Sequence, residues 1–434
     1  MPMHHTSPGT AHFIDLEMID QLAEKVENQA RATNYREQTF CDITAAALDE
    51  IDDSVFFDPI GMSRFIRKSS VQQKASLQFS DLSITLFRNR NFYIELLCWF
   101  TASTSIHSHG FCGSFKVVAG SSLHTKYRFT PRSTRSGRAI IGELESVDVE
   151  LLKRNNIRTI HGGSGGLLHS LFHLEEPSIS LLIRTHRSPI LQPQYNFYPP
   201  GLALDSSELS NDAEVRLLSR MISLCENHKR ETLVELLTDF AADLDFARLS
   251  WLALANSATI EENLDNDDFW IRAIERHGKG AEVLRAACQQ QNAKKPLYNL
   301  RAVSNDPELR FFLAGLLNAP DRRTLLQLLE KNTGKEAPLQ FIARMLVRLT
   351  DLAPDPQSLL REMSKWRSHT QYQFPSRLAP IINEIGPGND RQTWLLRALG
   401  EKNPSSQTAP LPEENNNFER LRQLPELAAL WESS

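Results

Sequence analysis

The chain has 434 residues, which exceeds the usual size of a single domain, so we expect two domains. Hydrophobic residues make up 41% and charged residues 23%, the composition of a globular protein with real cores rather than of a membrane or disordered chain. The formal net charge of −5 gives no general attraction to nucleic acid or to an anionic membrane.

The N-terminal sequence and the cysteines bear on the compartment. The first residues, MPMHHTSPGTAHF, contain no apolar segment long enough for a signal peptide or a membrane span. The five cysteines are scattered without CxxC spacing, which suits a reducing cytosol and disfavours zinc bound by thiolates. We expect a cytoplasmic protein, with residues 1–12 as a disordered tail.

The next part of the chain reads as a β-rich domain over residues 13–189, with helices at its start. Its first 55 or so residues have helix-like periodicity, as in MIDQLAEKVENQA. From about Leu77 the residue pattern changes to short runs rich in β-branched and aromatic residues, separated by polar or glycine-containing turns. These runs are LSITLF, FYIELLCWF, GSFKVVAG, HTKYRF, RAIIGEL and ISLLIRT. The pattern is typical of a β-sandwich or small barrel.

The rest of the chain reads as helical. A proline-rich linker is expected over residues 190–212, which include SPILQPQYNFYPPG in part. Apolar residues then recur at three- and four-residue steps, which predicts a helical domain over residues 213–400. Residues 401–434 are expected to be a mobile tail with a short helix.

Two histidines one residue apart, His107 and His109, stand in STSIHSHGFCGSFKVVAG. Strand alternation places both imidazoles on one face, where they can converge on one metal ion. Downstream, SGGLLHSLFH offers His169 as the third ligand, with His173 and His161 as alternatives. We expect His124 at the surface of a hairpin.

This spacing resembles the cupins. Their first motif is HxH, three or four residues, Glu, six residues and Gly, and their second is PxG, two residues, His, three residues and Asn. His107 and His109 match the first motif, which ends at Gly120 and has Gly113 where its glutamate would stand. His169 matches the second motif. The resemblance implies an α+β chain in which a cupin-type jelly-roll β-barrel with N-terminal helices precedes an all-α domain.

A three-histidine cupin without the glutamate is similar to the cysteine dioxygenase group of thiol dioxygenases, over about residues 77–189. The segments IELLCW and EPSISLL also resemble strands of that group. The resemblance implies Fe(2+) at the three histidines and oxidation of a small thiol or chelating carboxylic acid by O2. The family's Ser-x-His-x-Tyr strand reads Ser180-x-Leu182-x-Arg184 here, which departs from the pattern at the histidine and the tyrosine.

Three further residues are candidates for catalysis. Arg184 and Arg88 can pair a substrate carboxylate through two parallel hydrogen bonds, and His173 can orient a ligand or move a proton. Two alternatives to the oxygenase stay open. One is a metallo-cupin isomerase or lyase that uses zinc, manganese or nickel. The other is a non-enzymatic ligand sensor whose helical domain binds a protein partner or forms a homodimer.

Overall fold

The computed structural model describes residues 16–51, 59–68, 80–100, 104–163, 165–187, 193–228, 230–263, 268–351, 373–383, 389–399 and 416–431. The chain divides into two compact units. Unit 1 comprises residues 1–124 and 152–194, and unit 2 comprises residues 125–151 and 195–434. The expected tail over residues 1–12 and most of the expected C-terminal mobile stretch lie outside the described residues.

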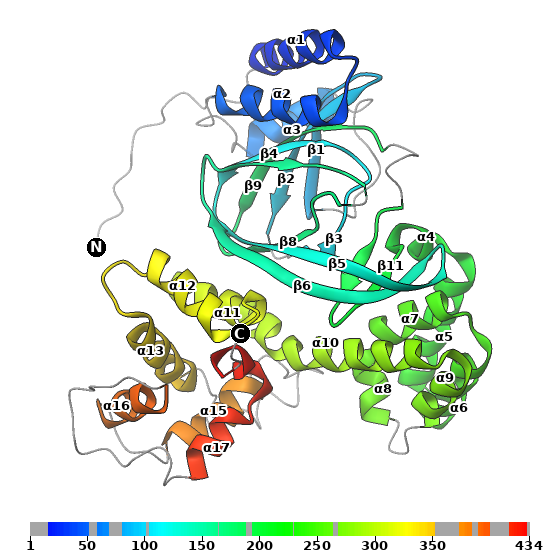
Figure 1. Ribbon diagram of the computed structural model, residues 1–434, viewed down its shortest axis with the longest axis vertical. Coiled ribbons are helices and arrows are strands. Elements are labelled where there is room, and N and C mark those ends of the chain that lie inside the picture. Colours follow the sequence, from blue (N-terminus) through cyan, green and yellow to red (C-terminus); the bar gives the residue numbers. More distant parts are fainter. Residues whose placement is uncertain are drawn as a thin grey trace. The chain divides into compact units, whose positions relative to one another are not determined.

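Unit 1 begins with three helices, α1 (Leu16–Ala32), α2 (Glu37–Asp49) and α3 (Pro59–Lys68). They lie over one face of a sheet (Figure 1). Buried polar contacts join α2 to that sheet, because Thr44 Oγ1 donates to Ser114 Oγ at 2.9 Å and Ser114 Oγ donates to the Cys41 carbonyl at 2.9 Å. These bonds satisfy polar groups that would otherwise be costly to bury.

The sheet of unit 1 has five antiparallel strands in the order β1-β2-β9-β4-β7. Their bounds are Leu82–Arg88, Phe92–Trp99, Ser178–Thr185, Gly113–Ala119 and Ile157–Ile160. Strand β2 is buried along its whole length, so both of its faces pack. Its even-numbered residues, Phe92 to Cys98, belong to the core shared with α1–α3, whereas Leu97 and Trp99 belong to a second core on the opposite face.

Two short strands, β3 (Ile106–His107) and β8 (His169–His173), pair antiparallel with His107 opposite His169. Strand β8 also neighbours β5 (Ser122–Ser136), whose first three residues belong to unit 1. Trp99 of the five-stranded sheet stacks on His173 of β8, with 4.6 Å between ring centroids. The face of the sheet that carries Leu97 and Trp99 therefore packs on the side of β8.

Unit 2 takes the remainder of β5 and most of β6 (Ala139–Leu152), followed by β10 (Asn196–Tyr198) and β11 (Leu202–Leu204), in the order β10-β11-β6-β5. Charged residues alternate along the long hairpin of β5 and β6. Cross-strand ion pairs join Lys126 to Asp148, Arg128 to Glu145 and Arg132 to Glu143. Such exposed pairs add little energy individually, but they favour the register of the two strands.

The rest of unit 2 is helical. Its helices are α4 (Ser206–Asn211), α5 (Ala213–His228), α6 (Arg230–Asp243), α7 (Phe246–Ala255), α8 (Ser257–Asn263), α9 (Asp268–His277), α10 (Lys279–Val303), α11 (Pro307–Asn318), α12 (Arg322–Asn332), α13 (Pro338–Asp351), α15 (Gln373–Asn383), α16 (Asn389–Ala398) and α17 (Asn416–Arg422), with the 3-10 helix η4 (Pro425–Leu430). One core joins Ala139 and Ile141 of β6 to residues of α5–α10.

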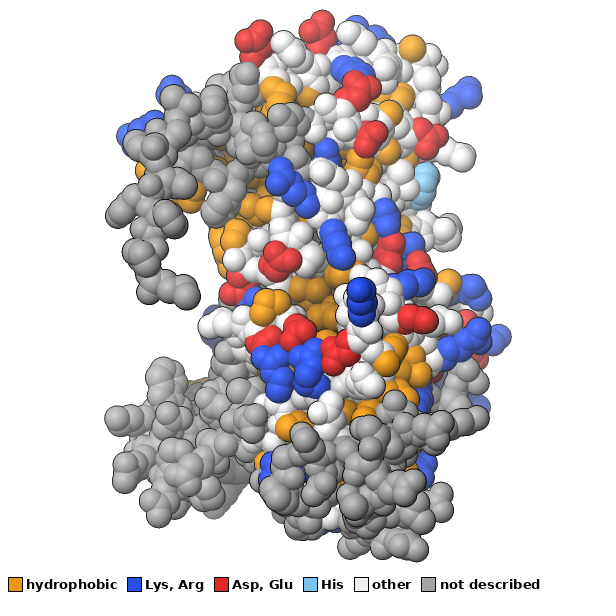
Figure 2. All heavy atoms as spheres, turned by 90° about the vertical axis from the view of Figure 1, so that its left-hand side faces the viewer, with side chains coloured by type: hydrophobic (Ala, Val, Ile, Leu, Met, Phe, Trp, Pro, Cys, Tyr) orange, Lys and Arg blue, Asp and Glu red, His pale blue; other side chains and the backbone are white. Residues whose placement is uncertain are grey.

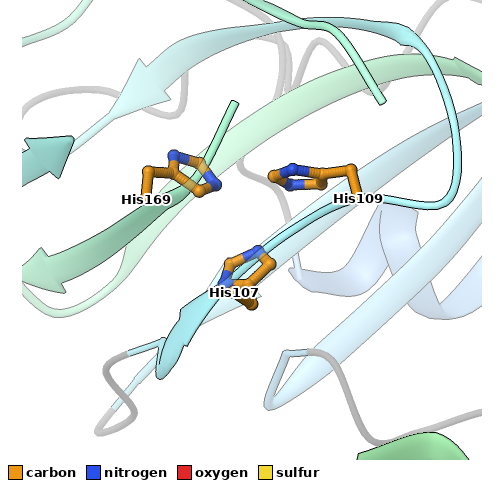
Figure 3. Close-up of side chains that lie close together, drawn as sticks. All are labelled: His107, His109 and His169. Carbon is orange, nitrogen blue, oxygen red and sulfur yellow. The ribbon is translucent and has the colours of Figure 1, made fainter. Parts of the chain in front are cut away.

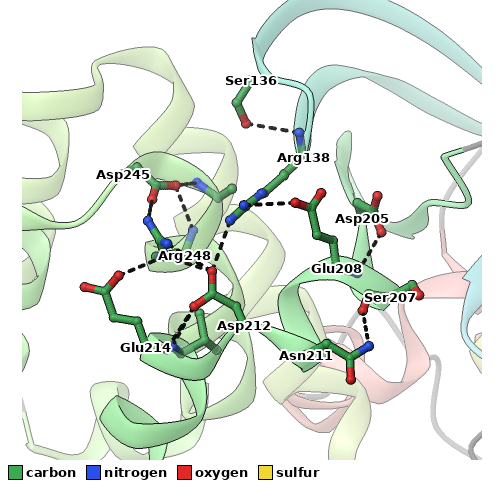
Figure 4. Close-up of polar contacts among 12 residues, drawn as sticks. Ser136, Arg138, Asp205, Ser207, Glu208, Asn211, Asp212, Glu214, Asp245 and Arg248 are labelled. Atoms are coloured by element: carbon green, nitrogen blue, oxygen red, sulfur yellow. Dashed lines mark hydrogen bonds and ion pairs between the residues drawn. The ribbon is translucent and has the colours of Figure 1, made fainter.

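A polar network joins the hairpin to the first helices of unit 2 (Figure 4). Asp212 Oδ2 accepts from Arg138 Nη1 at 3.1 Å and from Arg248 Nε at 3.1 Å, while Asp212 Oδ1 accepts from the Val215 N–H at 3.2 Å. Burial raises the pKa of Asp212, but the hydrogen bonds from Val215 and Arg248 outweigh it and hold the pKa below its usual value. The carboxylate therefore stays ionised and holds the hairpin turn to α5 and α7.

The predicted content of helix and antiparallel sheet, with a helical region after the strands, is confirmed. Strands β10 and β11 and helix α4 lie within residues 193–212, the described part of the linker expected over residues 190–212, and its role as a connection between domains stays a prediction. Leu202 and Leu204 of β11 are fully buried there. Among the described helices, none combines the length and the hydropathy that a membrane span requires.

Candidate metal centre

Three histidines from two distant parts of the chain meet inside unit 1 (Figure 3). His107 ends β3, His109 follows two residues later, and His169 begins β8 opposite His107. Each is only 2% exposed. The pairing of β3 with β8 brings the two sequence segments together.

The three rings point toward one another (Figure 3), and their possible ligand atoms all lie within 4.8 Å of one another. The ring centroids are 4.7 Å apart for His107 and His109, 4.8 Å for His107 and His169, and 4.9 Å for His109 and His169. Nitrogens bound to one ion at 2.0–2.1 Å lie about 3 Å apart. Small ring movements would therefore bring this set to coordination distance.

The hydrogen bonds of the first two rings fix which nitrogen carries the proton. His107 Nδ1 lies 2.8 Å from the Ser105 carbonyl, and His109 Nδ1 lies 3.1 Å from the Leu167 carbonyl. A carbonyl oxygen only accepts, so each Nδ1–H donates and each Nε2 keeps its lone pair. Metal-binding histidines in proteins have this same arrangement.

Burial favours the neutral form of both rings. It lowers the pKa of His107 to about 4, against a smaller opposing effect of the hydrogen bond to Ser105. Burial, and then the neighbouring His107, lower the pKa of His109 well below its usual value. Neutral imidazole is the form that binds a metal ion, and both rings have that form at pH 7. The residues present therefore fit a metal ion.

The described residues of the glycine-rich segment, 161–163 and 165–166, precede β8 and contact His109. The Gly163 N–H donates to the His109 carbonyl at 3.1 Å, and the Leu167 N–H donates to the His161 carbonyl at 2.8 Å. A Cβ on Gly166 would lie 2.2 Å from the His161 carbonyl oxygen, so only glycine fits there. The segment thus contacts the backbone of His109, and the carbonyl of Leu167, the next residue along the chain, contacts the His109 ring.

Gly113, the position that the resemblance matches to the glutamate of the cupin motif, has no room for a side chain. A Cβ on Gly113 would lie 2.0 Å from the Ile183 carbonyl oxygen and 2.8 Å from the Arg184 Cα. No side chain fits at this position while β4 and β9 pair as they do. Among the described residues, the group that can hold a metal contains three histidines and no carboxylate.

His124 was wrongly expected at a surface. It is fully buried on β5, and its Nε2 lies 2.8 Å from His169 Nδ1. The two rings are nearly perpendicular, at 85°, with centroids 4.9 Å apart. The burial of His124 could not be predicted from the sequence, because the run SSLHTKYRF is mostly polar, which is the pattern of an exposed hairpin.

Arg184 lies close to the centre without joining the three histidines. Its guanidinium carbon lies 4.1 Å from the centroid of Phe111 and 4.6 Å from that of Tyr93, and its Nε lies 3.5 Å from Glu95 Oε2. The Phe111 ring also packs edge-on with His109, at 5.0 Å between centroids. Burial lowers the pKa of Arg184 to about 9, which leaves the guanidinium charged at pH 7.

The other candidates lie elsewhere. His173 stacks on Trp99, and its Nδ1 lies 2.8 Å from Ser122 Oγ. Arg88 is exposed at the end of β1 and is not brought to the histidines. His161, the remaining alternative ligand, is half-buried at the start of the glycine-rich segment, outside the metal-binding group found among the described residues.

No family model matches the chain, and no curated protein matches it in sequence. A solved structure with a partial likeness is the crystal structure of the DMSP lyase DddQ from Ruegeria pomeroyi DSS-3, at 15% identity and a TM-score of 0.21. The likeness covers 36% of this chain and 78% of that chain. A TM-score this low supports no conclusion about function, so the site is interpreted from its own geometry.

Proposed function

We propose that unit 1 is a metal-dependent enzyme of the cupin type, with a jelly-roll barrel, in which His107, His109 and His169 hold a divalent transition metal. The observation that carries this proposal is the convergence of three buried, neutral imidazoles, two of which have their Nδ1 atoms bound to carbonyl oxygens. Three facial imidazole ligands leave positions open for a substrate and O2 when the ion is iron(II).

The charge of the site indicates the class of substrate. The three ligands are neutral, and the acceptors of His107 and His109 are carbonyl groups, so nothing in the set offsets the double charge of an ion. Arg184 adds a positive charge near the histidines, because the Phe111 ring contacts both its guanidinium and the His109 ring. The ion pair with Glu95 offsets this charge only in part. We expect an anionic substrate, either a thiolate or a carboxylate.

The surrounding side chains orient the substrate and exclude water. Phe111 and Phe115 are almost completely buried and pack against the histidine rings. In our proposal, Arg184 reaches past Phe111 to bind a substrate carboxylate. His173 is 1% exposed and stacks on Trp99. In our proposal it holds the Trp99 ring in place beside the site and does not bind the ion.

The leading reaction is oxidation of a small thiol or chelating carboxylic acid by O2 with iron(II), as in the thiol dioxygenases. A metal-dependent lyase or isomerase is the second candidate. It is favoured by β9, where Leu182 and Arg184 replace the histidine and tyrosine that the dioxygenases carry, and where Leu182 packs in the apolar core of this face.

Two measurements test the proposal. Metal content of protein purified without chelators should approach one ion per chain, and His107→Ala combined with His169→Ala should abolish it. His277→Ala, on α9 of unit 2, is the matched control and should keep the ion. Equal, substoichiometric metal in all three proteins would contradict the metal site.

Oxygen uptake then distinguishes the two reactions. Iron-loaded protein should consume O2 with cysteine or 3-mercaptopropionate and less with cysteamine, which lacks the carboxylate that Arg184 would bind. If no thiol supports uptake although the protein holds iron, oxidation of a thiol is excluded and the lyase or isomerase becomes the leading function.

A further inference from the structure

A fourth buried histidine contacts the three-histidine group from β5. His124 is fully buried, its Nε2 lies 2.8 Å from His169 Nδ1, and Phe115 packs edge-on against it at 6.4 Å between centroids. The same Phe115 ring lies 6.4 Å from the His169 ring. His124 is therefore held between its neighbours in one orientation, with a ring nitrogen at hydrogen-bond distance from a predicted metal ligand.

The tautomer of His169 depends on this contact. A neutral imidazole carries its proton on one nitrogen only. If His169 Nδ1–H donates to His124 Nε2, then His169 Nε2 has a lone pair, and this is the nitrogen on the side of His107 and His109 (Figure 3). In the reverse arrangement the proton of His169 would sit on Nε2, where it would block coordination.

In the first of these two arrangements, each of the three Nδ1 atoms donates to an acceptor. His107 and His109 each have a backbone carbonyl as the acceptor, and His169 has the imidazole of His124. A backbone carbonyl survives any substitution at its own residue, whereas the acceptor of His169 is a side chain. This third contact is the one that mutation can remove.

We propose that His124 is a positioning residue that holds His169 in the Nδ1–H tautomer, with its Nε2 directed toward His107 and His109. The inference rests on the proposed metal site for its consequence, which is metal affinity. Partners that orient a ligand histidine contribute 10–100-fold to metal affinity. The contact itself does not depend on the ion.

The experiment compares two substitutions of similar size. His124→Gln places a side-chain carbonyl near the former Nε2 and keeps an acceptor, whereas His124→Leu removes it. In competition titrations with a chromophoric chelator and Co²⁺, we expect His124→Gln to bind within about threefold of the native protein and His124→Leu to bind about 10–100-fold more weakly. Circular dichroism of both metal-free variants checks that they fold.

A second readout needs no metal. In metal-free protein labelled with ¹⁵N-histidine, His169 should carry its proton on Nδ1 in the native protein and in His124→Gln, and should lose that preference in His124→Leu. If His124→Leu does not fold, His124→Asn replaces it, because its shorter side chain places the acceptor too far away.

The outcomes separate the inference from the proposed function. Native protein that binds no Co²⁺ contradicts the metal site, while the NMR comparison still decides the role of His124. Native Co²⁺ affinity in His124→Leu, together with an unchanged His169 tautomer, overturns the inference and leaves the metal site standing.

Discussion

At the scale of single residues, the site depends on imidazoles that stay neutral because they are buried. His107 and His109 are each 2% exposed, and water reaches neither ring well enough to stabilise a charge. The neutral form suits metal binding, but it lowers the free energy of unfolding at acidic pH. A protein that buries neutral histidines must charge them to unfold at low pH.

Metal-free protein should therefore lose stability as the pH falls from about 6.5 toward 4. The pKa of His107 is about 4 when folded and near 6.5 when unfolded, so the unfolded chain takes up the proton first. This difference amounts to about 3 kcal/mol, fully present above pH 6.5 and lost progressively below it. Urea denaturation of chelator-treated protein at several pH values measures the slope.

His107→Gln provides the comparison for this slope. The variant should lose less stability over the same pH range, although its stability at pH 7 is lower. Identical slopes for the two proteins would show that His107 titrates in the folded state as it does in the unfolded chain.

Residue spacing carried the prediction of the three histidines, because alternation in a strand and a fixed interval to a glycine are local properties of the chain. The role of His124 could not be found in this way. Its contact with His169 joins strands 45 residues apart, and its neighbours in sequence are polar. The catalytic role of Arg88 stays a prediction. Its exposure at the end of β1 could not be read from the sequence, because a strand pattern indicates which residues alternate but not which end of the strand reaches the surface.

At the scale of elements, β4 and β9 approach each other closely at Gly113. These strands pair from Gly113, opposite Arg184, to Ala119, opposite Ile179. The absence of a side chain at Gly113 lets the two backbones approach beside the residue that we assign to substrate binding. A glycine at position 113 is thus required by the pairing of β4 with β9, independently of any metal ion.

Gly113→Ala should destabilise the protein by about 1–3 kcal/mol or more, because its Cβ would overlap the Ile183 carbonyl oxygen. Gly137→Ala is the control, since nothing lies within 4 Å of the Cβ that it would add. Thermal denaturation of both variants measures the difference. Equal melting temperatures would mean that β9 moves aside without cost, and Gly113→Glu would then be worth testing as a fourth ligand.

The sequence predicted the positions of most strands but not their partners. The runs around GSFKVVAG and ISLLIRT became β4 and β9 as expected. The segment 195–211 was missed because Pro199, Pro200 and Gly201 resemble a linker, whereas Gly201 in fact lets the chain approach Gly142 closely, with a bond from the Gly142 N–H to the Gly201 carbonyl at 2.8 Å.

At the scale of the whole molecule, the two units have separate cores, and charges of both signs are interspersed on the face in Figure 2. Separate cores favour separate unfolding transitions. The predicted domain boundary at residue 189 stays a prediction, and the division by contacts places the hairpin residues 125–151 with the helices.

Binding of a metal should raise only the melting transition of unit 1. An ion at 100 times its dissociation constant stabilises the folded state by about 2.7 kcal/mol, which corresponds to roughly 5–10 °C for a unit of this size. Differential scanning calorimetry with and without Co²⁺ measures the shift. The double variant His107→Ala/His169→Ala should show none, and a shift of equal size in that variant would place the ion elsewhere.

The hairpin of β5 and β6 has a consequence for how this chain can be divided. The hairpin begins and ends in unit 1, but its residues 125–151 belong to unit 2, where Ile140 and Ile141 pair with Ala203 and Leu202, more than 60 residues downstream. A fragment that stops at residue 189 would carry β6 into solvent without β11. A cut at residue 189 would therefore separate strands that pair, so the two units have to stay on one chain.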